Sequence, residues 1–148
     1  MSIFGHSVYI TVMREKNMEI PEKYTKSIEQ RLYEQAAAEQ SGDFHKLYEF
    51  TLPSIREKRT EERNDEPELS INSLKDFVKS IKTAQIKEVT IEKYHPTSEI
   101  YGELPSAVVK STTLYNNSKA SSFRTIWVLY NEVWYTTAVG KFHKNESA

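Results

Sequence analysis

The sequence predicts an α+β protein in which N-terminal helices pack on one face of a curved antiparallel sheet of four or more strands. In three segments between residues 21 and 82, apolar residues recur every three or four positions, which is the period of a helix. From residue 85 onward the period becomes two, which is the period of strands. The connections between these later segments are short, which favours antiparallel pairing, and helices followed by strands in one chain indicate the α+β class.

The first twenty residues are predicted to form an N-terminal arm or an extra strand. In the segment HSVYITVM, Val8, Ile10 and Val12 alternate with other side chains, as they do in a strand. A remnant of cloning is the alternative. We assign residues 21–140 to a single domain and residues 141–148 to a C-terminal tail.

A first helix is predicted from Pro21 to Gln40, because proline suits the first helical position and an apolar stripe follows at Tyr24, Ile28, Leu32 and Ala36. Gly42 suits a left-handed helix end, and Asp43 can accept hydrogen bonds from the first free amides of a second helix. This pair therefore needs no catalytic role.

The second helix is predicted over Phe44 to Leu52, with Pro53 ending or kinking it. The charged run that follows reads as a solvated face, and residues 64–68 read as an exposed loop. A third helix begins near Ser70 or Asn72 and carries an apolar stripe at Leu74, Phe77, Val78 and Ile81. Its lysines are expected to face solvent.

Four strands are predicted over residues 86–94, 106–115, 122–130 and 133–140. If Asn131 and Glu132 form a two-residue turn, Leu129 lies opposite Trp134 and Trp127 opposite Thr136. One face then carries both tryptophans, and the other carries Arg124, Ile126, Val128, Tyr130 and Tyr135. Both faces are substantially apolar, so the second face needs a cover. Self-association as a homodimer is one cover, and curling of the sheet or the N-terminal arm is the other.

Composition excludes several functions. The 148-residue chain has a formal net charge of -1 and 38% hydrophobic residues, which is typical of a soluble globular protein and indicates no nucleic-acid partner. It contains no cysteine, so thiol nucleophiles and thiolate metal sites are excluded. The N-terminus has neither a basic region nor a long apolar run before Arg14, so we expect no membrane insertion. A cytoplasmic location is the default, with an exported mature form left open.

The order of an amphipathic helix, Gly-Asp, LYEFTLPSIREK, a third helix and strands ending in RTIWVLYNEVWYTTAV resembles the nuclear transport factor two-like superfamily over residues 21–140. The resemblance implies a cystatin-like cone, in which helices close over a bent sheet, often a homodimer, and a cone that holds a small molecule. The turn departs from the family pattern, because Asn-Glu stands where many relatives have Asp-Gly. The resemblance does not imply one activity.

An enzymatic reading finds little support in the residues. The chain has only Asp43, Asp65 and Asp76 as aspartates, and no acidic residue between Leu104 and Glu132 could serve as an acid or base on the inner strands. The four histidines are scattered, so we predict no metal site and no cofactor. The alternative function is a small lyase or isomerase of the dehydratase or ketosteroid-isomerase type, using His95 or His45 with Tyr48.

We therefore expect a non-enzymatic binding or assembly domain with a small-ligand pocket in the cone. The predicted pocket lining is Leu47, Tyr48, Phe77, Trp127 and Trp134. Five basic residues stand against one acidic residue between positions 105 and 145, so a small apolar or anionic ligand is expected. Protection of exposed strands from aggregation is the alternative use of these lysines.

Overall fold

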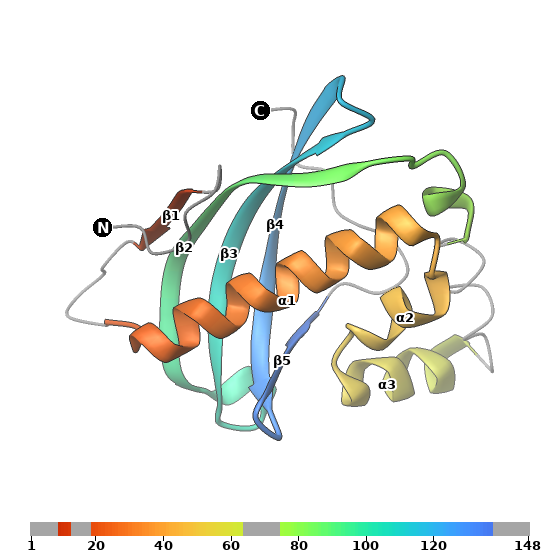
Figure 1. The fold of residues 1–148 in the computed structure, drawn as a ribbon. Helices are drawn as coiled ribbons and strands as arrows, with labels where there is room; N and C mark the ends of the chain where they lie inside the picture. Colours follow the sequence, from red (N-terminus) through yellow and green to blue (C-terminus); the bar gives the residue numbers. More distant parts are fainter. Residues whose placement is uncertain (1–8, 13–18, 64–74, 138–148) are drawn as a thin grey trace.

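The computed structural model describes residues 9–12, 19–63 and 75–137 of the chain. It confirms the α+β class: a long helix lies across a curved sheet, and two shorter helices follow beside one edge of that sheet (Figure 1). The expected loop at 64–68, the end of the fourth strand at 138–140 and the C-terminal tail lie outside the described residues.

Helix α1 (Glu22–Ser41) begins and ends one residue later than predicted, so Pro21 precedes the first helical position instead of occupying it. Pro21 is its N-cap, and Gly42 closes its C-terminus in the left-handed conformation at φ 77°. Asp43 then caps helix α2 (Phe44–Glu49), because its carboxylate accepts a hydrogen bond of 3.1 Å from the Lys46 amide. The structural interpretation of the Gly42-Asp43 pair is confirmed.

The second helix is shorter than predicted, and Pro53 begins a new helix instead of kinking the old one. Helix α2 ends at Glu49, and helix α3 spans Pro53–Arg63. Between them, the Leu52 amide donates to the Thr136 carbonyl at 2.9 Å, and the Thr136 amide donates to the Phe50 carbonyl at 2.8 Å. The connection is therefore held extended against the sheet edge, and Pro53 suits the first turn of α3 because its missing N–H would have no partner there.

The predicted third helix lies only partly within the described residues, where residues 75–79 are helical. Val78 is buried and Lys75, Lys79 and Lys82 are exposed, as expected. Asn116, at the tip of a hairpin, fixes the following chain, because its Oδ1 accepts from the amides of Lys82 and Thr83. These bonds hold the end of the helical segment at the start of the sheet.

The five strands stand in sequence order across the sheet: β1 (Tyr9–Val12), β2 (Ala84–Ser98), β3 (Leu104–Tyr115), β4 (Lys119–Tyr130) and β5 (Val133–Thr136). The β2–β3, β3–β4 and β4–β5 pairs are antiparallel, whereas β1 adds to β2 in parallel. A short 3-10 helix, η1 (Glu99–Tyr101), joins β2 to β3. Irregularities in the β2–β3 register, at 86–88, 91–93 and 95–98, are of the kind that bends a sheet.

The register of the last hairpin is confirmed residue by residue. Trp127 pairs with Thr136, Leu129 with Trp134 and Tyr130 with Val133. Both turn residues have positive φ, 52° at Asn131 and 66° at Glu132, which matches the two-residue turn that joins twisted strands. Alternation along β4 and β5 therefore places both tryptophans on one face.

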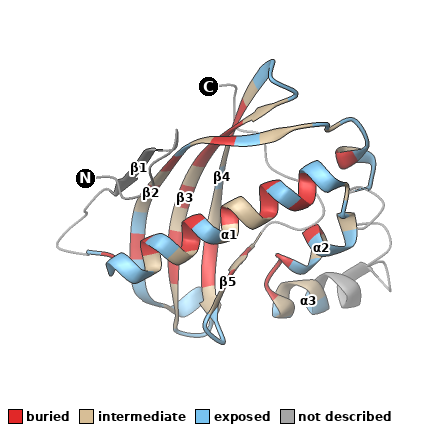
Figure 2. Ribbon diagram, viewed as in Figure 1, coloured by how far each residue is buried: buried red, intermediate tan, exposed pale blue. Residues whose placement is uncertain are grey.

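The core lies between that face and α1 (Figure 2). Trp127 and Trp134 are 1% and 0% exposed, and Ile28 and Leu32 of α1 belong to the same cluster. The Trp134 indole N–H donates to the Ser27 hydroxyl of α1 at 2.9 Å. Because Trp134 meets α1 both through apolar packing and through this bond, the helix is fixed against the end of the sheet.

Arg31 of α1 links the helix to the β5 edge. Its Nε donates to the Trp134 carbonyl at 2.8 Å, and its guanidinium lies 4.1 Å from the centre of the Phe50 ring. The carbonyl on this edge strand thus has a charged donor, and the cation stacks on an aromatic ring.

Replacing Trp127 with alanine is expected to lower the free energy of unfolding by about 3–5 kcal/mol, because a large side chain is removed from a packed interior. Urea denaturation measures the change. Ile100→Ala is the control, since Ile100 is 83% exposed and its loss should change stability by less than about 0.5 kcal/mol. Equal stability of the Trp127 variant and the wild type would show that α1 does not cover this face.

Candidate functional site

The predicted pocket residues lie in and around the packed core. Leu47, Trp127 and Trp134 are buried, whereas Tyr48 and Phe77 are partly buried and pack against that cluster. The space beneath α1 is therefore filled largely by the side chains that were expected to line it.

A small cavity lies between α1 and the sheet. It has a volume of about 20 Å³ and is lined by Gln35 and Glu39 from α1 and by Ser111, Thr113, Tyr115, Thr125 and Trp127 from the sheet, among others. A space of about 10–15 Å³ suffices for one water molecule. The lining is part polar and part apolar, and the cavity is the size of a water molecule and not of a metabolite.

Glu39 is the most unusual group in this cavity. It is 4% exposed, and its Oε1 accepts a hydrogen bond of 3.0 Å from the Tyr115 hydroxyl. Burial raises the pKa of Glu39 to about 8, because the ionised carboxylate loses its hydration, and the bond from Tyr115 offsets part of this effect. Burial likewise raises the pKa of Tyr115. At neutral pH the Glu39 carboxyl is thus largely protonated.

The Trp127 indole nitrogen is buried without a hydrogen-bond partner among the described residues. This contrasts with Trp134, whose N–H is satisfied by Ser27. Glu39 and Trp127 both line the cavity, which could hold one small polar molecule. Its size leaves no room for a substrate next to Glu39.

The residues of the alternative catalytic set do not meet beneath α1. His45 is exposed on α2, with its ring 4.7 Å from that of Phe44, and His95 is exposed on β2. Tyr48 is partly buried, and the Arg56 guanidinium lies 5.7 Å from its ring centre. None of these three lines the small cavity between α1 and the sheet.

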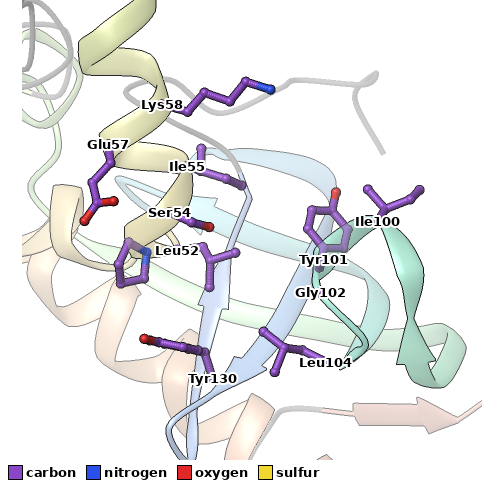
Figure 3. Close-up of a pocket in the computed structure, with 11 residues that line it drawn as sticks. Leu52, Ser54, Ile55, Glu57, Lys58, Ile100, Tyr101, Gly102, Leu104 and Tyr130 are labelled. Atoms are coloured by element: carbon purple, nitrogen blue, oxygen red, sulfur yellow. The ribbon is translucent and has the colours of Figure 1, made fainter.

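A much larger hollow lies outside this interior, between the start of α3 and the η1 turn (Figure 3). This groove has a volume of about 570 Å³. Leu52 and Ile55 line it from the α3 side, Ile100 and Tyr101 from η1, and Leu104 and Tyr130 from the ends of β3 and β4. Volumes of roughly 300–1,000 Å³ are usual for ligand sites.

The groove lies on the face of the sheet opposite α1. Ser106 pairs with Val128, so Leu104 shares a face with Tyr130, whereas Trp127 and its partner Ala107 point the other way.

The backbone at the η1 wall of the groove is constrained, because Gly102 and Glu103 have positive φ values of 70° and 68°. Glu103 is not glycine, so its left-handed conformation costs about 1–2 kcal/mol, which the surrounding turn must offset. Its amide donates to the Ser98 carbonyl at 2.7 Å, which closes the turn that carries Ile100.

The residues of the predicted dimer face differ in their exposure. Val128 is fully buried within the chain, and Tyr130 is 40% exposed. Arg124 donates two hydrogen bonds to Glu92, of 2.8 and 2.9 Å, and these bonds are the main cause of the lowered pKa of Glu92. Ile126 and Tyr135 are partly buried. Val128 therefore belongs to the interior and is not available to a second molecule.

Sequence reasoning missed Glu39 and the groove. The search for an acid covered the strands and the aspartates, but Glu39 extends the buried stripe of α1, three positions after Ala36. This placement was a usable signal. Ile100 offered a weaker one, as an apolar residue next to the Tyr-Gly of a turn.

Comparison with protein-family models, with curated proteins and with solved structures finds no match to this chain. In the described part of the chain, no helix is both long and apolar enough to cross a membrane. Within the same residues, no three histidine, aspartate or glutamate side chains gather as a metal site would require.

Glu39→Gln should flatten the dependence of stability on pH. The unfolded carboxyl has a pKa near 4.5 and the folded one about 8, so the folded state binds one more proton between these values and stability falls as pH rises through this window. The slope is at most about 1.4 kcal/mol per pH unit. Glutamine retains an acceptor for Tyr115 but does not ionise.

Urea denaturation from pH 5 to 8 measures this effect, with Glu88→Gln, at an exposed position of β2, as the control. The stability advantage of the Glu39 variant over wild type should grow with pH, whereas the control should run parallel to wild type. Parallel curves for all three proteins would show that Glu39 is already ionised in the fold.

Proposed function

We propose that this protein is a non-enzymatic binding domain, and that its ligand site is the groove between α3 and η1. One observation carries the proposal: Ile100 and Tyr130, the large hydrophobic side chains left exposed in the described part of the chain, both line this groove. Exposed apolar surface gathered in one hollow marks a binding site. The occupant is a small apolar molecule.

The small volume of the cavity beside Glu39 supports a binding function over a catalytic one. An enzyme of the lyase or isomerase type needs a substrate-sized space beside its acid or base. The space beside Glu39 is about 20 Å³, whereas the groove is about 570 Å³. The groove also lacks the histidines of the alternative catalytic set, since neither His45 nor His95 lines it.

Kinship with the nuclear transport factor two-like superfamily is part of the proposal. It is supported by the long helix α1 across a bent antiparallel sheet and by the confirmed register of the final hairpin. The ligand site departs from the expected place, because the groove lies outside the space that α1 covers.

Titration of ¹⁵N-labelled protein with 1-decanol tests the site. We expect shifts of the amide signals of Ser54, Ile55 and Gly102, which line the groove, and smaller shifts at Glu39. Ile100→Asp should weaken binding several-fold, because it places a charge in the apolar wall at an exposed position that the fold tolerates. Ala37→Asp, on the exposed side of α1, is the matched control and should bind like wild type. Saturable shifts centred on Glu39 would move the site to the interior, and no shifts would refute the binding proposal.

A homodimer through the sheet face opposite α1 stays a prediction. Sedimentation equilibrium at high micromolar concentration should show the dimer mass, and Ile126→Asp should lower the dimer fraction, because Ile126 is only partly buried on that face. A monomer at these concentrations would contradict the prediction. Val128 is unsuitable for this test, since a charge there would destabilise the fold itself.

A further inference from the structure

The groove is lined on its α3 side by two charged residues, Glu57 and Lys58. Lys58 lies three residues after Ile55 and four after Ser54, so all three share one side of the helix and line the groove. In Figure 3 the Lys58 side chain extends toward the wall formed by η1, whereas the Glu57 carboxylate points the opposite way. Glu57 lines the groove as well, but its carboxylate is turned away from the η1 wall toward which Lys58 extends.

Lys58 has no ion pair or hydrogen bond with any residue that the structure describes. Among the described basic residues, Lys26, Arg31 and Arg124 pair with Glu22, Glu34 and Glu92. What distinguishes Lys58 from the other exposed lysines is its place at the groove. The charge of Lys58 is thus available to a bound molecule. An unpaired cation beside a concave apolar surface fits an amphipathic anion, whose chain covers the hollow while its head group meets the cation.

The positions of the acidic residues around the groove indicate how an amphipathic anion would be oriented in it. Glu99 and Glu103 flank the η1 wall but do not line the groove, and both side chains are exposed. They would repel an anion placed at that wall. The α3 wall carries Lys58, which extends toward η1, and Glu57, whose carboxylate points away from it. The favourable arrangement therefore has the negative group at Lys58 and the apolar chain running toward Ile100, Leu104 and Tyr130.

We infer that the groove binds an amphipathic monocarboxylate, with the carboxylate paired to Lys58 and the alkyl chain on the apolar surface between α3 and η1. This inference rests on the proposed function, because it specifies the ligand of the same site. The apolar part supplies most of the binding free energy, and Lys58 supplies the preference for an acid over a neutral molecule of the same length.

The test compares decanoate with 1-decanol at pH 7.5, below the concentration at which decanoate aggregates, by the amide shifts of Ser54, Ile55 and Gly102. Wild type should bind decanoate about two- to fivefold more tightly than decanol, because a partly exposed ion pair contributes up to about 1 kcal/mol. Added salt should weaken decanoate binding and leave decanol binding nearly unchanged.

Lys58→Gln should abolish the preference for decanoate without weakening the binding of decanol. Glu57→Gln is the matched control: it removes the neighbouring acid, which lines the groove but points away from the η1 wall, and it should retain the preference or increase it. Both positions are exposed, so neither variant should lose the fold.

Equal affinities of wild type for the two ligands, or a preference that persists in Lys58→Gln, would overturn the inference while leaving the binding site in place. Failure of both ligands to bind would refute the proposed function as well, so the two failures are distinguishable.

Discussion

The packing of α1 against the two tryptophans of the last hairpin is the contact on which the rest of the structure depends. The turn at Asn131 and Glu132 sets the register, and the register puts Trp127 and Trp134 on the same face. Side chains on a strand alternate between faces, so a shift of one residue would turn both tryptophans away from α1. Ser27 and Arg31 then hold the helix to Trp134 by hydrogen bonds to its indole and its carbonyl.

This contact also determines where a ligand can bind. Because Trp127 and Trp134 fill much of the space beneath α1, the cavity between α1 and the sheet among the described residues is only the size of a water molecule. The chain continues beyond α1 through the extended connection at Thr51, which lies against Thr136, and α3 starts directly after it. The helix is thereby carried to the end of the sheet where β3 begins and β4 ends, and the groove forms between them. The filled interior beneath α1 and the groove beside α3 therefore both follow from the way the helices pack against the last hairpin.

Local signals in the sequence were sufficient for much of the fold. Gly42, Asp43 and the two-residue turn act through their own backbone geometry, so their roles could be predicted without knowing the tertiary structure. The end of α2 could not, because Phe50 and Leu52 leave the helical pattern in order to bond with Thr136, more than eighty residues away in sequence. Pro53 was ambiguous for the same reason, since a proline both ends and begins helices.

The candidate site was less predictable than the fold. Glu39 continues an apolar stripe, and a carboxylate in such a stripe usually reads as the edge of a polar face. Its burial depends on Tyr115, from a strand that the local pattern of α1 cannot indicate. The groove combines α3, η1 and the ends of two strands. Val128 is buried within the chain, although the alternation of side chains along its strand placed it on the predicted dimer face. Periodicity assigns side chains to faces, but it does not say which part of a face another segment covers.

The most direct measurement of the central claim is a crystal structure of the protein grown with 1-decanol. The account predicts density for the alcohol between α3 and η1, against Leu104 and Tyr130, with Trp127 and Trp134 still packed beneath α1. Density beneath α1, with either tryptophan displaced from its place, would contradict it.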